Sequence, residues 1–138
     1  MQSLPPSASI TVLLIEDDPK QLASWSDALR NCSAHYSVLE ATSGQEGLEL
    51  LKHHEVDCVV LDLDLTVSSG FEFLLEVVPN RNRPEIAVLI FTRLQNATLE
   101  RLSLENGAQA YLIKQFSSAD VLDKAIQKAV NAVASALV

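Results

Sequence analysis

The stretch Cys58-Val59-Val60-Leu61-Asp62-Leu63-Asp64 (CVVLDLD) carries the pattern that decides the fold class. Four apolar residues in a row, without polar alternation, are typical of a strand buried on both faces of a parallel sheet. Asp62 and Asp64 end that run, so two acids lie at the carboxyl end of the strand. Open α/β sheets bind their ligands at this end of their strands. We therefore expect an α/β protein whose chemistry depends on residues that directly follow its strands.

The same pattern repeats on both sides of this stretch. Apolar segments typical of strands occupy residues 10–15, 36–40, 56–61, 86–91 and 111–113. Predicted helices lie between these strands, since the apolar residues there recur at helical spacing. Capping residues mark helix starts at Asp18, Ser43, Gly70 and Ser118, and Gly107 marks a helix end. Five strands that alternate with five helices predict a parallel sheet, covered on both faces and joined by right-handed crossovers.

Composition limits the organisation and the partners of the chain. Its 138 residues suit one domain, and 48% hydrophobic with 20% charged residues suit a packed core. Residues 1–9 are rich in Pro and Ser and predict a flexible tail, which leaves 10–138 for the domain. No apolar run is long enough to span a membrane and no secretory signal is evident, so we expect a soluble, cytoplasmic protein. The net charge of −8 argues against binding nucleic acid.

The residues that follow the predicted strands form a chemically coherent set. They are Glu16, Asp17, Asp18, Asp62, Asp64, Thr92 and Lys114. Carboxylates brought together at one edge repel each other unless a cation neutralises them. Oxygen ligands without His or Cys favour Mg²⁺ over zinc. A hydroxyl and an ammonium group beside such a cluster are suited to hold phosphoryl oxygens, and this combination is typical of phosphoryl transfer.

Four stretches of the chain resemble the receiver domain of two-component response regulators. They are LLIEDDP (13–19), CVVLDLDLTVSSG (58–70), LIFT (89–92) and GAQAYLIKQF (107–116). The resemblance extends from about Ile10 to Val133. It implies a flavodoxin-like (βα)₅ fold with five parallel strands in the order 2-1-3-4-5.

The resemblance also implies roles for the acidic residues. Asp62 corresponds to the phosphoacceptor. Glu16 and Asp17 correspond to the acidic pair that, together with Asp62 and the backbone carbonyl of Asp64, holds Mg²⁺. The protein would then be a phosphoprotein of a phosphorelay, and it would catalyse only its own phosphotransfer and dephosphorylation.

The remaining site residues correspond to the switch. Thr92 and Lys114 would contact the phosphoryl oxygens, and Tyr111 would be the aromatic side chain that changes rotamer with Thr92. The expected donor is a sensor histidine kinase or a phosphotransfer protein. The expected output is a changed surface on the fourth helix, fifth strand and fifth helix, offered to an unidentified partner or to a second copy of the chain.

Besides Thr66, which stands where Pro is common, two positions depart from the family pattern. Gln115 follows Lys114 where the family usually has Pro in a cis peptide bond, so we expect a trans bond and a differently shaped loop. Arg93 follows Thr92 where a small residue is usual, which places a long cation beside the predicted site.

Two alternatives use the same residues. The segment from Asp62 to Thr66 also fits the DxDxT motif of haloacid-dehalogenase-type phosphatases, with Asp64 as the general acid and base. Chain order argues against this alternative, because in that family the nucleophile lies on the first strand and the metal-binding acids follow the Lys. The second alternative is a pseudo-receiver that has the same fold but acts as an unphosphorylated interaction module.

Overall fold

A single parallel sheet organises the chain. The computed structural model describes residues 9–65, 70–77 and 86–136. The strands are β1 (Ile10–Ile15), β2 (Tyr36–Ala41), β3 (Cys58–Leu61), β4 (Ala87–Thr92) and β5 (Ala110–Ile113). The helices are α1 (Pro19–Cys32), α2 (Gly44–His53), α3 (Gly70–Val77), α4 (Ala97–Glu105) and α5 (Ala119–Ala136), with a 3₁₀ turn η1 (Lys114–Phe116) between β5 and α5. The strand order is β2-β1-β3-β4-β5, as predicted.

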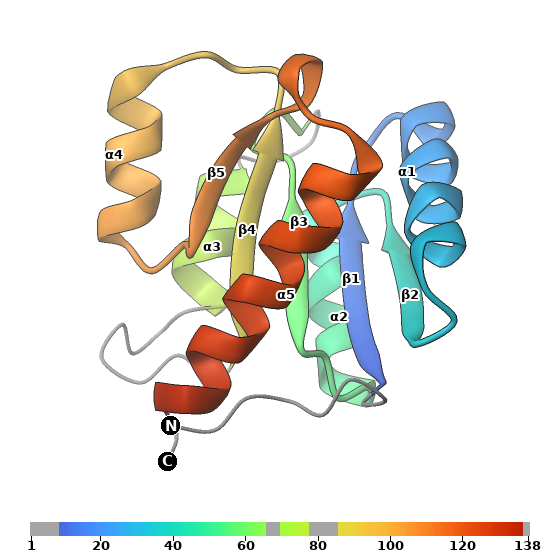
Figure 1. The fold of residues 1–138 in the computed structure, drawn as a ribbon. Coiled ribbons are helices and arrows are strands. Elements are labelled where there is room, and N and C mark those ends of the chain that lie inside the picture. Colours follow the sequence, from blue (N-terminus) through green and yellow to red (C-terminus); the bar gives the residue numbers. More distant parts are fainter. Residues whose placement is uncertain (1–8, 66–69, 78–85, 137–138) are drawn as a thin grey trace.

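The helices form a layer on each face of the sheet. Helices α1 and α5 cover one face, and α2, α3 and α4 cover the other (Figure 1). Strand β1 shows how the sequence serves both layers, because successive side chains of a strand point to opposite faces. Val12 and Leu14 belong to the core under α1 and α5, whereas Leu13 and Ile15 belong to the core under α2 and α3. The uninterrupted apolar runs of the sequence are therefore the strands whose two faces are both covered by helices.

Burial separates the central strands from the edges. Every residue of β3 and β4 is buried, whereas the edge strand β5 is only half-buried along its length. β3 begins at Cys58, two residues later than predicted. At its entry, the Asp57 carboxylate accepts a hydrogen bond from the Thr11 backbone N–H at 2.8 Å, in addition to the backbone bond from Asp57 N–H to the Thr11 carbonyl at 2.9 Å. Thr92 is the last residue of β4, whereas the sequence placed it just after the strand.

The predicted caps position the helices. Asp18 accepts a hydrogen bond from the backbone N–H of Lys20 at 2.9 Å and opens α1, with Pro19 at its first position. Ser43 does the same for α2 and Ser118 for α5. Gly107 follows α4 with a φ of 112°, a left-handed conformation that only glycine adopts without strain.

Some expectations fall on residues that the structure does not describe. These are residues 1–8 of the predicted tail, Thr66 of the DxDxT segment, and Ser68 and Ser69 before α3. Within the described part of the chain, each helix is too short or too polar to cross a bilayer.

Candidate functional site

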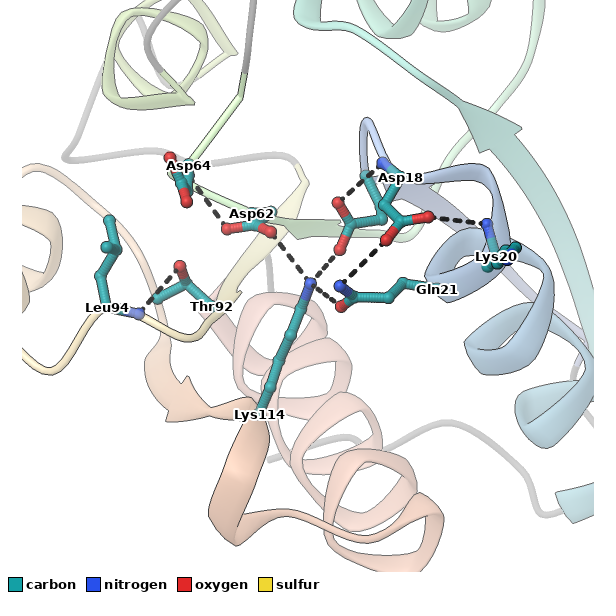
Figure 2. A network of polar contacts seen from close by, with 9 residues as sticks. Asp18, Lys20, Gln21, Asp62, Asp64, Thr92, Leu94 and Lys114 are labelled. Carbon is teal, nitrogen blue, oxygen red and sulfur yellow. Dashed lines mark hydrogen bonds and ion pairs between the residues drawn. The ribbon is translucent and has the colours of Figure 1, made fainter.

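A buried lysine joins the ends of three strands. The Lys114 ammonium, directly after β5, donates a hydrogen bond to Asp62 Oδ2 at 2.9 Å and also forms an ion pair with Glu16 Oε1 (Figure 2). Glu16 follows β1 and Asp62 follows β3. All three side chains are buried, with residue exposures of 3% for Glu16, 6% for Asp62 and 8% for Lys114. The structure thus brings together the acids and the ammonium that the sequence placed after separate strands.

Backbone contacts fix the position of Asp62. Its N–H donates to the carbonyl of Ile15 at 3.1 Å, which ties the end of β3 to the end of β1. Its Oδ1 accepts a hydrogen bond from the backbone N–H of Asp64 at 3.0 Å. One carboxylate oxygen therefore contacts a backbone donor and the other contacts Lys114. The side chain of Asp64 itself is exposed.

Gly70 allows the chain to turn close to Asp62. A Cβ built at Gly70 would lie 2.4 Å from the carbonyl oxygen of Asp62 and 2.7 Å from the Cα of Leu63. Both contacts are with backbone, which cannot move aside as a flexible side chain can. Gly70 also donates its N–H to the carbonyl of Leu63 at 3.3 Å. A glycine is therefore required where α3 begins against the loop that carries the acceptor candidate.

The electrostatics of the cluster leave negative charge in excess. Glu16 and Asp62 offer two carboxylates in contact with Lys114, which offers one ammonium group. Burial raises the pKa of Glu16, while hydrogen bonds from Lys114 and from the backbone N–H of Asp18 oppose that rise. The buried carboxylate is thus incompletely compensated by the protein alone. An additional cation would stabilise the charged form of the cluster.

The donor set can be compared with the needs of a metal ion. Among the described residues, no group of three or more His, Cys, Asp or Glu side chains is arranged to hold one. Glu16 is occupied by Lys114 and by the Asp18 N–H, at 3.2 Å from its Oε2. The remaining predicted ligands are the Asp17 and Asp62 carboxylates and the Asp64 carbonyl. They are hard oxygen donors beside an excess of negative charge, and their chemistry fits Mg²⁺.

The predicted switch residues lie at the β4 end of the site. Thr92 is fully buried, and its Oγ1 accepts a hydrogen bond from the backbone N–H of Leu94 at 3.4 Å. The half-buried Tyr111 donates its hydroxyl to the carbonyl of Leu94 at 2.6 Å. Burial raises the pKa of the Tyr111 hydroxyl, which keeps it a donor. Thr92 and Tyr111 thus bind opposite sides of one residue in the loop between β4 and α4.

Sequence reasoning missed two residues of the site besides Gly70. Gln21 accepts a hydrogen bond from the Lys114 ammonium at 3.0 Å, and its own amide donates to Asp18 at 3.4 Å. The ring of Phe91 lies with its centroid 5.8 Å from the ammonium. A signal for Gln21 existed in its position three residues after the Asp18 cap, on the same side of the first turn of α1. Phe91 gave no signal, since it belongs to an apolar strand.

The loop after Lys114 has the shape that the missing proline predicts. The described residues contain no cis peptide bond, so the Lys114–Gln115 bond is trans, and the chain continues as the turn η1. The Gln115 side chain donates to the carbonyl of Arg93 at 3.3 Å. These two departures from the family pattern are therefore in contact with each other.

Comparison with known proteins places this geometry in a family. Residues 12–127 match the family model of the response regulator receiver domain. The chain belongs to this family. A receiver domain from Clostridium thermocellum has the same fold, with a TM-score of 0.81 and 28% identity over 94% of this chain and 99% of that one. The comparisons give no support to the phosphatase alternative over the receiver.

Two curated relatives show that receivers of this kind occur within longer proteins. The chain is 32% identical over 107 residues to a probable cyclic di-GMP phosphodiesterase of Vibrio cholerae, covering 78% of this chain and 24% of that protein. It is 31% identical over 120 residues to the transcriptional regulatory protein PdtaR of Mycobacterium tuberculosis, covering 87% and 56%. The receiver thus spans between a quarter and about half of the length of these relatives.

Proposed function

We propose that this receiver domain, residues 10–138, accepts a phosphoryl group on the side chain of Asp62. The observation that supports this most directly is the contact of the Asp62 carboxylate with the Lys114 ammonium at 2.9 Å, at the carboxyl end of a central strand. Asp62 retains an exposure of 6%, so a small group can reach it. The donor is the phosphohistidine of a sensor kinase or phosphotransfer protein. A carboxylate oxygen of Asp62 forms the new bond to phosphorus as the bond from phosphorus to nitrogen breaks.

Lys114 and Thr92 are placed to stabilise the transferred group. The ammonium is already bound to the acceptor carboxylate, so it requires little reorganisation to bind a phosphoryl oxygen. Thr92 can donate its hydroxyl proton to a phosphoryl oxygen, because its contact with the Leu94 N–H uses only the hydroxyl oxygen as an acceptor. The Asp17 and Asp62 carboxylates and the Asp64 carbonyl would hold Mg²⁺, which would neutralise charge on the phosphoryl oxygens, while Glu16 holds Lys114 beside them. The receiver acts only on its own phosphoryl group.

The switch follows from the shared contact at Leu94. The phosphoryl group on Asp62 carries about −1.5 to −2 charges in place of the single charge of the free carboxylate, and it attracts the Thr92 hydroxyl. Moving Thr92 releases the N–H of Leu94, whose carbonyl is bound by Tyr111, so the loop before α4 responds directly. The face of α4, β5 and α5 then presents a changed surface to an output partner or to a second copy of the chain.

Intact-mass measurement tests the acceptor. The protein is incubated with acetyl phosphate and Mg²⁺, and the same is done for Asp62→Asn and for the control Asp120→Asn, which alters an exposed acid on α5. We expect one phosphoryl adduct on the wild type and on Asp120→Asn, and none on Asp62→Asn or without metal. Steady phosphate release without an adduct would instead indicate a phosphatase. Absence of both, together with failure to bind beryllofluoride, would indicate a pseudo-receiver.

A further inference from the structure

A cavity of about 300 Å³ lies beside the phosphoacceptor site, on the side of α1. It is formed where the first turns of α1, the residue after β4 and the start of η1 come together. The residues used in the argument are Lys20, Gln21, Trp25, Arg93, Lys114 and Gln115. Figure 2 shows Lys20 and Gln21 on the same side of Lys114, away from Thr92.

The cavity is lined by cations without a carboxylate among the lining residues. Lys20, Arg93 and Lys114 are three of the ten Lys and Arg residues in a chain of net charge −8. Of the exposed cations that the structure describes elsewhere, Arg30, Lys52, Arg101 and Lys124 form ion pairs and Lys128 does not. Within the described residues, neither Lys20 nor Arg93 forms an ion pair. Two exposed cations thus line one cavity, although the Lys20 charge also helps to lower the pKa of the neighbouring Asp18 carboxyl.

Gln115 and Arg93 build one edge of the cavity together. The Gln115 amide donates to the Arg93 carbonyl at 3.3 Å and so links the end of β5 to the residue after β4. Proline at position 115 would lack the amide side chain that makes this contact. The cavity edge therefore depends on two residues by which this chain departs from the family pattern.

Trp25 supplies an apolar part of the cavity wall. Its ring packs edge-on against Phe91, with the two centroids 4.7 Å apart and the planes at 85°. Phe91 is 1% exposed, so the indole rests on the core. A ligand in the cavity can therefore meet both cations and an aromatic surface.

We propose that this cavity binds a small phosphate-bearing anion non-covalently, as a site separate from the covalent site at Asp62. Lys20 and Arg93 supply the charge that the ligand requires, since Lys114 is already bound to two carboxylates. A volume of about 300 Å³ equals roughly ten water molecules, at about 30 Å³ each. That is more than an orthophosphate ion needs and leaves room for an organic group against Trp25.

Fluorescence of Trp25, the single tryptophan of the chain, reports on the cavity directly. The wild type is titrated with inorganic pyrophosphate and with phenyl phosphate, without Mg²⁺ and at constant ionic strength, using sodium chloride as the control titrant. We expect saturable binding of both probes and no saturation with chloride. Lys20→Gln and Arg93→Gln should each weaken binding about threefold to tenfold through loss of a charge-assisted contact. The control Lys124→Gln, on α5, should bind as the wild type does.

Absence of saturable binding to the wild type would overturn the proposal. Equal affinity of the wild type, Lys20→Gln and Arg93→Gln, with circular dichroism showing all three folded, would overturn it as well. Gln115→Pro provides a further test, because loss of the amide contact to Arg93 should weaken binding while leaving both cations in place. Asp62→Asn should retain binding although it cannot be phosphorylated. Anion binding without a phosphoryl adduct on the wild type would refute the acceptor proposal and leave this one intact.

Discussion

Replacing Gly70 by alanine should disturb the acceptor site through the backbone alone. The new methyl group would lie 2.4 Å from the Asp62 carbonyl oxygen, whereas an ordinary contact begins at 3.4 Å. The two backbone segments must therefore separate by about 1 Å. Gly70 opens α3, and the segment that it would displace holds Asp62 through the bond from Asp62 N–H to Ile15. The perturbation adds one methyl group and changes no charge or hydrogen-bonding side chain.

The expected cost can be estimated from known effects. Overpacking a close-packed site costs about 1–3 kcal/mol, and the better helix propensity of alanine returns less than about 1 kcal/mol at a helix start. A net loss of about 2 kcal/mol should lower the melting temperature by about 4–8 °C for a chain of this length. A misplacement of about 1 Å at a reacting group can reduce a rate about a hundredfold. We expect phosphorylation of Asp62 by acetyl phosphate to slow by at least about tenfold.

Gly47→Ala is the matched control. A Cβ at Gly47 would lie 2.6 Å from Cδ1 of Ile15, which is the end of a flexible side chain. Alanine in the middle of α2 should also gain about 1 kcal/mol of helix propensity, so its stability should stay within about 1 kcal/mol of the wild type. Urea denaturation and time-resolved intact mass measure both quantities. The reasoning is refuted if Gly70→Ala matches the wild type in both, or if Gly47→Ala is the more damaging variant.

Three further changes test the buried groups. Lys114→Met leaves Glu16 and Asp62 without their buried cation and should lower the free energy of unfolding, measured in urea, by about 3 kcal/mol. Adding Asp62→Asn to that variant should recover part of the lost stability, because one of the two unpaired charges is removed. Ser103→Ala should raise the free energy of unfolding by about 1 kcal/mol, since the buried Ser103 hydroxyl has no hydrogen-bond partner among the described residues; a lower urea midpoint would contradict this. Burial raises the pKa of the Cys58 thiol, so an aromatic disulfide reagent should titrate one thiol in the folded protein and two in urea. Two reactive thiols without urea would show that the core opens readily.

The sequence predicted the fold well because its decisive signals are local. Uninterrupted apolar runs identify β3 and β4, and capping residues identify where α1, α2 and α5 begin. Helical spacing of apolar residues marks α5 as well, and the structure buries two of them, Leu122 and Ile126, completely. The strand order came from the family resemblance and not from the runs, because periodicity along a strand does not say which strands are neighbours.

The site was predicted as a set of residues but not as a network. Because Glu16, Asp62 and Lys114 each follow a predicted strand, the sequence predicted them at one edge of the sheet. The structure places them in contact. The sequence could not predict that Lys114 also binds Gln21, because that contact depends on how α1 lies against the end of β5. Gly70 was noted as a helix start, whereas its true constraint is a close backbone approach that appears only in three dimensions.

The buried lysine gives the site its readiness to react. Desolvation penalises each buried charge at the edge of the sheet, and the one ammonium of Lys114 cannot fully balance the two carboxylates of Glu16 and Asp62, so this arrangement costs stability in the resting state. Because of this cost, the ion pairs of Lys114 are sensitive to nearby charge. A divalent cation, or a change of charge at Asp62, should change which groups Lys114 binds. The same ammonium lines the cavity formed with Lys20 and Arg93. Because Lys114 is already bound to Glu16 and Asp62, an anion in the cavity draws on Lys20 and Arg93, whereas a phosphoryl group on Asp62 draws on Lys114. The two sites therefore depend on different cations.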